Sequence, residues 1–250
     1  MPMVDLSPIN KRLRTLWAQH ILHAPAGWEY RPDLIEWPKS KAELGKRAQE
    51  YCGRIPWPMQ YPDAPIGGLI AIGMNPSLAK TKSVVDNLES LLLPLNGLDV
   101  ALEDPARIQA VIEFERCMRD PNRGPGERPG FYKTYYGPIS QIAQTLNIPW
   151  TAAELFAVRH TNQTEFLRLL GNHEPFAQAQ LQEFNEMIKV LKPRVILVLN
   201  AGVRDHHLLG RWWPDVPIVF EKSISCWGWD GRTRKEMIAG IVAKVRATNF

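Results

Sequence analysis

The stretch Leu69-Ile-Ala-Ile-Gly-Met-Asn-Pro-Ser77 decides the fold, because it joins a short apolar run to a polar turn. The run Leu69–Ile72 is continuous and short, which predicts a strand covered on both faces. Gly73 lets the backbone turn sharply after the strand, and Pro76 fixes the loop that follows. We therefore expect the working pocket of this chain at the loop after a core strand near Ile70–Met74.

Further apolar runs predict three more strands, at Glu154–Val158, Val195–Leu199 and Val216–Phe220. Amphipathic segments with helix-starting or helix-ending residues separate them, and Ser7 is the expected N-cap of the first helix. These segments begin near residues 7, 40, 105, 138 and 178, and a last one covers 237–245. Asp104-Pro105 marks the start of the third segment, and Lys192-Pro193 marks the end of the fifth. Strands that alternate with helices form mainly parallel sheets. The sequence predicts an α/β fold, a three-layer α/β/α arrangement around a central, mainly parallel four-stranded sheet.

Length and composition predict one large folded unit. The chain has 250 residues, of which 45% are hydrophobic and 22% charged, enough for a full core. We expect an α/β domain over residues 66–250 and a helical and loop extension over residues 1–65 packed on it. No apolar run approaches the ~18 residues that a bilayer span needs, and the polar N-terminus is not signal-like. A cytoplasmic monomer without a membrane partner is the expectation.

The cysteines and histidines predict neither a metal site nor a cofactor. Cys52, Cys117 and Cys226 are widely spaced, so they supply neither a disulfide framework nor the four ligands of an iron–sulfur cluster. His206 and His207 are adjacent and point about 100° apart on a helix, which prevents them from sharing one ion. We expect reduced, buried thiols.

The charge balance permits contact with nucleic acid without requiring it. The net charge is +4, and basic residues cluster at Lys11–Arg14 and Arg232–Lys235. Each cluster could touch phosphates. Each is explained equally well as the solvated face of a helix, so charge alone does not assign a partner.

Polar segments follow every predicted strand, at the edge of the sheet where open α/β folds bind ligands. Asn75 follows the first strand and Arg159–Asn162 the second; Asn200 and Glu221–Gly231 follow the other two. The uncharged amide of Asn75 suits a reaction in which water is oriented and departure of the leaving group drives the chemistry. Cleavage of a nucleoside N-glycosidic bond is such a reaction. Asparagine also stabilises turns without any catalytic role.

A strand followed by Gly-x-Asn-Pro and a long helical stretch resembles the first motif of the uracil-DNA glycosylase superfamily, especially its mismatch-specific and single-strand-selective branches. The resemblance implies that Asn75 positions the hydrolytic water, with Gly73, Met74, Pro76 and Ser77 lining the substrate site. It also implies that the protein acts on a base extruded from DNA.

The same resemblance assigns residues to the base itself. An aromatic residue after the first motif stacks on the extruded base, and Phe131 or Tyr136 occupies that place here. A polar residue after the second strand reads the edge of the base, with His160 and Asn162 as candidates. The resemblance covers about residues 66–245 in the order of its elements.

The sequence departs from this superfamily at the second motif. The loop after the fourth predicted strand has neither the histidine nor the proline of the usual His-Pro-Ser motif. Ser225 could replace part of the function by stabilising the departing base, while Trp227 and Trp229 could act as a wedge or stacking platform. Arg232 is a candidate contact to the DNA backbone.

A second resemblance leads to an alternative function. Asn75-Pro-Ser together with Leu155-Phe-Ala-Val-Arg-His-Thr161 is also similar to a family of bacterial proteins that carry an Asn-Pro-Ser-Thr-Ala motif. That relationship leaves the fold expectation unchanged. The substrate would then be a free nucleotide, nucleoside or modified base, hydrolysed or only bound, without DNA glycosylase activity.

Overall fold

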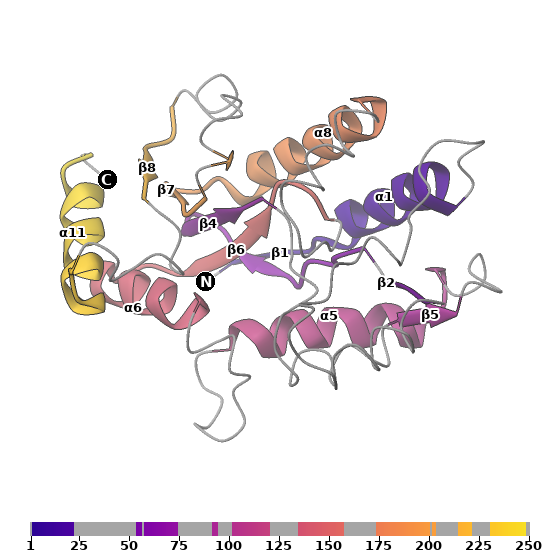
Figure 1. Ribbon diagram of the computed structural model, residues 1–250, viewed down its shortest axis with the longest axis horizontal. Helices are drawn as coiled ribbons and strands as arrows, with labels where there is room; N and C mark the ends of the chain where they lie inside the picture. The colour runs from indigo at the N-terminus through magenta and orange to yellow at the C-terminus, as the bar shows by residue number, and fades with distance from the viewer. Residues whose placement is uncertain are drawn as a thin grey trace.

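The computed structural model (Figure 1) describes residues 2–22, 54–56, 58–74, 92–94, 102–120, 135–157, 174–200, 202–203, 215–221 and 231–248. Its centre is a parallel four-stranded sheet in the order β6-β4-β7-β8. The strands are β4 (Leu69–Gly73), β6 (Trp150–Glu154), β7 (Val195–Val198) and β8 (Ile218–Phe220). The expected α/β fold with a mainly parallel four-stranded sheet is therefore confirmed.

The two central strands are apolar along their whole length because helices cover both faces of the sheet. Every residue of β4 and β7 is buried. Burial on both faces removes the alternation of polar and apolar residues that one-sided sheets show. β4 pairs with both β6 and β7, and Gly73 at its end is the register partner of Glu154.

Five α-helices surround the sheet in the described part of the chain, compatible with three α/β/α layers. α1 (Ser7–Trp17), which continues into the π-helical turn η1 (Ala18–Leu22), packs against α8 (Glu174–Leu191). α6 (Gly137–Leu146) packs against α11 (Arg234–Arg246). Figure 1 shows α8 and α1 on one side of the sheet, α6 and α11 on the other, and α5 (Pro105–Arg119) below.

Two small antiparallel pairs complete the described elements. β1 (Met3–Val4) pairs with β3 (Ala64–Pro65), and β2 (Arg54–Pro56) pairs with β5 (Leu92–Pro94). The first pair holds the N-terminal segment against the residues that lead into β4. The apolar face of α1 then enters the same hydrophobic core as the sheet through Leu6, Ile9, Leu13 and Trp17.

The structure confirms the predicted start of α5 and the predicted end of α8. Asp104 caps α5, because its carboxylate accepts a hydrogen bond from the backbone N–H of Ala106 at 3.0 Å. α8 ends at Leu191, directly before the predicted stop at Lys192-Pro193. The predicted N-cap of the first helix is wrong: Ser7 is the first helical residue, and its N–H donates to the Asp5 carboxylate at 2.8 Å.

The predicted second strand is also wrong in position. It was expected at Glu154–Val158, but β6 ends where that run begins, at Glu154. The apolar residues Leu155, Phe156 and Ala157 are buried after the strand rather than within it. The shift of four residues moves Glu154 from the amino edge of the sheet to its carboxyl edge, where the ligand site is expected.

The first basic cluster does not form a continuous phosphate-binding face. Arg14 is buried, and its guanidinium donates to the side-chain oxygen of Gln60 at 2.7 Å. Arg12 pairs with Glu183 at 2.6 Å. Two of the charged side chains in this cluster thus hold α1 against neighbouring segments of the fold.

The predicted helix that begins near residue 40 lies outside the described residues. Among the helices that the structure describes, none combines the length and apolarity required to cross a bilayer.

Candidate functional site

The carboxyl edge of the sheet brings the end of β4 against the end of β6. Gly73 and Glu154 are register partners in the parallel ladder. The pairing continues past both strands, because Leu155 N–H donates to Gly73 C=O and Phe156 N–H donates to Met74 C=O, each at 3.0 Å. This extended pairing holds both strand ends in a fixed relation. It places Glu154 opposite Gly73, which precedes Asn75 by two residues in the sequence.

Gly73 is required here because of the close approach of Glu154. A Cβ atom added to Gly73 would overlap the carboxyl group of Glu154. The sequence suggested that this glycine serves to turn the chain. The structure adds a second reason, which is that only a residue without a side chain leaves room for the carboxyl group.

The Glu154 side chain is buried, and burial raises the pKa of its carboxyl to about 8, although the charge of Arg119 acts to lower it. Removal from water disfavours the ionised form of a carboxyl group. At neutral pH the group is therefore mostly protonated. Its Oε2 atom makes no hydrogen bond within the described structure, so this site holds a neutral carboxyl with unused hydrogen-bonding capacity.

Tyr61 fixes the backbone of Glu154 at the open edge of β6. Its hydroxyl donates to the Glu154 C=O at 2.9 Å and accepts from the Glu154 N–H at 3.3 Å. The side chain of Asn10 in turn binds both backbone groups of Tyr61, at 2.7 and 2.8 Å. α1 thus positions Glu154 through Tyr61, and burial raises the pKa of the Tyr61 hydroxyl well above its usual value.

A buried arginine from α5 acts on this carboxyl group through its charge. The Arg119 guanidinium carbon is 6.0 Å from the ring centroids of both Tyr61 and Tyr136. Arg119 pairs with Glu115, one helical turn earlier, at 3.3 Å, and both side chains are less than a tenth exposed. Nε and Nη1 of Arg119 make no hydrogen bond in the described structure. Buried donors without partners are costly, which is typical of a site that awaits a ligand.

The side of Glu154 that faces α1 and α8 is closed. The gap there, lined among others by Leu13, Tyr61 and Gln180, has no room for a water molecule. A ligand therefore cannot reach the carboxyl group through this gap.

Three of the predicted substrate-site residues lie in described segments near this edge. Gly73 and Met74 are buried at the end of β4. Tyr136 is buried at the N-cap of α6, with its ring edge-on to Tyr135 at 5.2 Å and tilted against Trp150 at 6.0 Å. Burial raises the pKa of the Tyr136 hydroxyl, while the charge of Arg119 acts to lower it and that of Glu154 to raise it. Its role as a stacking platform stays a prediction.

Arg232 is exposed and lies two residues before α11. Hydrogen bonds from Thr233 lower the pKa of Glu236, and the positive charge of Arg232 adds a smaller contribution. The remaining candidates fall outside the described residues: Asn75, Pro76, Ser77, Phe131, His160, Asn162, Ser225, Trp227 and Trp229.

Sequence reasoning missed Glu154, Arg119 and Tyr61. A signal existed for Glu154, since a single acidic residue between Ala153 and the apolar run Leu155–Ala157 is unusual unless it has a purpose. Arg119 follows Glu115 at the spacing of an ordinary surface ion pair. Only the packed fold distinguishes this pair from the exposed one on the same helix, between Arg116 and Glu113.

No group of three or more potential metal ligands occurs in the segments that the structure describes. No protein-family model matches the chain, and no curated protein is similar enough to indicate a relative. The site is therefore interpreted from its own chemistry.

Proposed function

We propose that this protein hydrolyses the N-glycosidic bond of uracil or another deaminated base in DNA, as a uracil-DNA-glycosylase-like α/β/α protein. One observation carries the proposal: a neutral, buried carboxyl group, Glu154, lies against the end of β4. The candidate water-positioning residue Asn75 follows that end by two residues. Ligands of open parallel sheets bind at this edge.

A neutral carboxyl group supports this chemistry better than an ionised one. When the bond between a base and its sugar breaks, the leaving base gains negative charge on its oxygen and nitrogen atoms. A carboxylate would repel that charge, whereas a protonated carboxyl can donate a hydrogen bond to it. Glu154 could therefore supply part of the leaving-group stabilisation that the missing His-Pro-Ser motif provides in the resembling superfamily.

The position of Glu154 also revises the choice of base-reading residue. The resemblance assigns this role to a polar residue after the second strand, for which His160 and Asn162 were the candidates. β6 ends at Glu154 itself. A protonated carboxyl offers one donor and one acceptor side by side, which matches the N–H and C=O edge of uracil or hypoxanthine. We therefore add Glu154 to these candidates.

The test measures strand cleavage after alkali treatment of labelled oligonucleotides that carry uracil, hypoxanthine, xanthine or a mismatch. Asn75→Ala is expected to abolish base release and to leave the unfolding temperature unchanged. Glu154→Gln keeps a donor and an acceptor and should retain part of the activity, whereas Glu154→Ala should lose it. Glu113→Gln, an exposed carboxylate on α5, is the control. Full activity of Asn75→Ala would overturn the assignment.

The pH profile provides an independent check. If the protonated form of Glu154 is needed, base release should fall as the pH rises through about 8. In Glu154→Gln this fall should disappear. A wild-type profile that stays flat up to pH 9 would show that the carboxyl proton has no part in the reaction.

A second function, hydrolysis or binding of a free nucleotide, nucleoside or modified base, is favoured by the unused donors of Arg119. A guanidinium binds a phosphate through two parallel hydrogen bonds. This one is buried, where the backbone of a DNA strand reaches less readily than a single nucleotide does. Release of base from nucleoside monophosphates, lost in Arg119→Met and independent of salt, would select this function over the first.

A further inference from the structure

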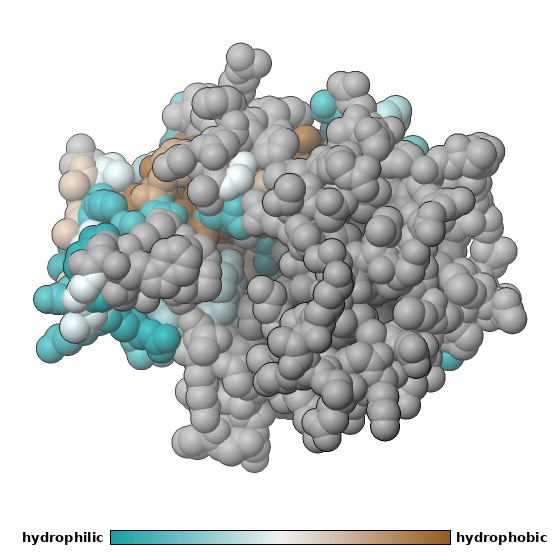
Figure 2. Space-filling model, in the orientation of Figure 1, coloured by the Kyte–Doolittle hydropathy of each residue, from teal (hydrophilic) through white to brown (hydrophobic). Residues whose placement is uncertain are grey.

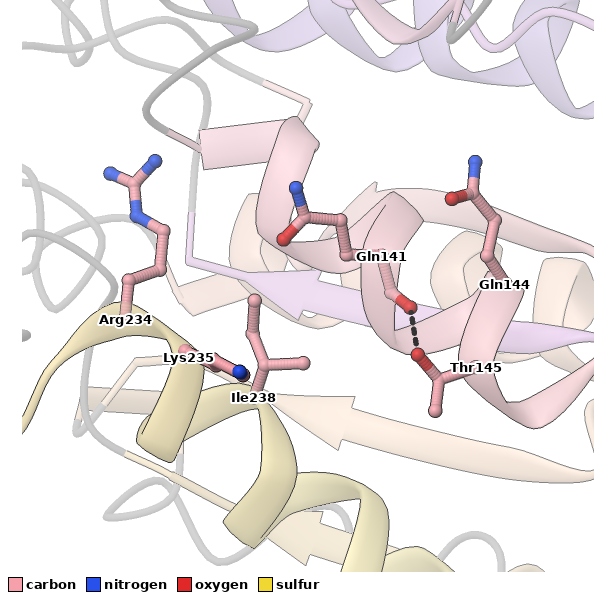
Figure 3. A pocket seen from close by; sticks show the side chains of 6 residues that line it. All are labelled: Gln141, Gln144, Thr145, Arg234, Lys235 and Ile238. Carbon is pink, nitrogen blue, oxygen red and sulfur yellow. Dashed lines mark hydrogen bonds between the residues drawn. The ribbon is translucent and has the colours of Figure 1, made fainter.

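A groove of about 500 Å³ runs between α6 and α11, on the other side of the sheet from α1 and α8 (Figure 3). Five of its six lining side chains are exposed, so the groove is open to solvent along its length. Figure 3 shows Gln141, Gln144 and Thr145 on α6, and Arg234, Lys235 and Ile238 on α11. The lining residues are Gln141, Gln144, Thr145, Arg234, Lys235 and Ile238.

The two walls of the groove differ in charge. The wall from α11 carries Arg234 and Lys235, whereas α6 has no charged residue and contributes the amides of Gln141 and Gln144. Residues 231–248 contain five Lys or Arg side chains and a single acidic one, Glu236. Figure 2 shows hydrophilic residues gathered over this part of the surface. Cations facing neutral hydrogen-bond donors form a surface that suits an anion with several oxygen atoms.

The placement of these cations is unfavourable for the helix itself. Arg234 and Lys235 are the first two residues of α11, where the helix dipole favours acidic side chains. The helix start is already stabilised by a capping box, in which Thr233 accepts from the Glu236 N–H at 3.2 Å and Glu236 accepts from the Thr233 N–H at 2.6 Å. The two cations therefore contribute nothing that helix formation needs.

Two of these donors are unused within the described structure. The side chains of Gln141 and Lys235 make no hydrogen bond or ion pair there, and Gln144 uses one amide hydrogen on Ser140 at 3.3 Å. Glu236, the nearest carboxylate in sequence, is held by Thr233. A ligand in the groove would thus meet the Lys235 amino group and the Gln141 amide without displacing a contact of either side chain.

We propose that this groove binds the phosphodiester backbone of a nucleic acid. Phosphates are contacted mainly by Arg, Lys and side-chain amides, the groups that line it. A groove that is open to solvent suits a polymer better than a small anion. The proposal deepens the proposed function and rests on it for the choice of DNA as the probe.

The groove is also well placed relative to the candidate site. α6 begins immediately after Tyr136 and returns through residues 147–149 to the first residue of β6, so its first turn lies at the carboxyl edge. Gln141 is one turn from that start. α6 therefore connects the groove, through Gln141, with the helix start at which Tyr136 lies.

The test measures binding of fluorescein-labelled 20-nucleotide single- and double-stranded DNA by fluorescence anisotropy over a range of salt concentrations. Lys235→Glu and Gln141→Glu change one wall each. Lys11→Glu, exposed on α1, changes the net charge as Lys235→Glu does and is the matched control. We expect Lys235→Glu to weaken binding about tenfold and to reduce the salt slope by about 1, Gln141→Glu to weaken it similarly, and Lys11→Glu to have little effect.

Any of three outcomes would overturn the proposal that the groove binds nucleic acid. The first is an equal loss of DNA affinity in Lys235→Glu and Lys11→Glu, and the second is wild-type binding that does not depend on salt. The third is that poly-glutamate displaces the labelled DNA as well as unlabelled DNA of equal charge does. Measuring Asn75→Ala in parallel separates the two proposals. If that variant binds DNA through the groove while neither it nor the wild type releases a base, the groove stands and the glycosylase function fails. If the wild type releases a base but the groove variants bind DNA as the wild type does, the glycosylase function stands and the groove proposal fails.

Discussion

Glu154 at the end of β6 and Glu236 at the start of α11 are the same type of residue in opposite environments. Burial raises the pKa of Glu154 to about 8, and one of its oxygen atoms has no partner in the described structure. Glu236 is exposed, and hydrogen bonds from Thr233 lower its pKa. Burial keeps the carboxyl of Glu154 neutral at a pH at which a glutamate in water is ionised, whereas the hydrogen bonds to Glu236 stabilise its ionised form.

The difference separates a structural carboxylate from a candidate functional one. The Glu236 carboxylate accepts from the backbone N–H and the hydroxyl of Thr233, so its role in the capping box is complete without a ligand. Glu154 and Arg119 are buried with unused donors and acceptors, and such groups destabilise the fold unless something binds them. Four measurements can break or sharpen this comparison.

The largest effect is expected from Arg119→Met. This change leaves the buried Glu115 without its ion pair to Arg119 and should lower the free energy of unfolding by about 3 kcal/mol. Arg116→Met removes the exposed pair with Glu113 and should cost less than about 1 kcal/mol. Urea unfolding at pH 7 measures both values. Equal losses would show that burial does not distinguish the two pairs.

The next effect is a pH dependence that belongs to Glu154. Its carboxyl has a pKa of 4.5 in the unfolded chain and of about 8 in the folded protein, so the folded form retains a proton that the unfolded form releases. Stability should therefore fall as the pH rises from about 5 to 8, at up to about 1.4 kcal/mol per pH unit.

Glu154→Gln should remove this component of the pH dependence, measured as unfolding free energies at pH 5.5 and 7.5. The titratable groups that interact with Glu154 are Arg119, Tyr61, Tyr135 and Tyr136. The three tyrosines stay neutral in this pH range because burial raises their pKa values. Glu236→Gln should leave the slope unchanged, because a lowered pKa changes stability only at more acidic pH. Parallel slopes for wild type and Glu154→Gln would refute the neutral carboxyl.

A smaller effect is expected at Gly73. Gly73→Ala places a Cβ atom on the Glu154 carboxyl and should cost about 1–3 kcal/mol, with loss of base release. Gly240→Ala in α11 has open space around the new Cβ and should stabilise the protein by about 0.5–1 kcal/mol. Thermal unfolding of the two variants compares them. A stabilising Gly73→Ala would mean that Glu154 has room to move away.

The smallest effect concerns the exposed member of the comparison. Thr233→Ala removes half of the capping box and should lower the free energy of unfolding by about 1 kcal/mol. Base release should be unchanged, since Thr233 lies outside the cluster of Glu154, Arg119 and Tyr136. A loss of activity larger than the loss of stability would connect the start of α11 to the site.

The fold was predictable where local patterns carry the information. The apolar runs of β4 and β7 indicated buried strands, and Asp104-Pro105 and Lys192-Pro193 marked helix ends that the structure confirms. β6 was misplaced because the small residues Ala152 and Ala153 give a weaker apolar signal than the run that follows. Its true end depends on pairing with Gly73 and on the hydroxyl of Tyr61, which are distant in sequence.

The candidate site was predicted only in part for the same reason. Sequence placed Gly73 and Met74 at the carboxyl edge and Tyr136 before a helix, which are local properties of a strand end and a helix start. It gave no indication that Arg119 would be buried beside Glu154, because an Arg four residues after a Glu is common on helix surfaces.

The sequence by itself determined the α/β class, the parallel sheet and the edge at which a ligand should bind, since these follow from hydrophobic period and the order of elements. The tertiary structure alone decided which charged groups lose their water. It brought Glu154, Arg119 and Tyr61 together from β6, α5 and the segment before β3, and burial there converts an ordinary carboxylate into a neutral donor. Desolvation depends on neighbours far apart in the chain, so no local pattern contains it.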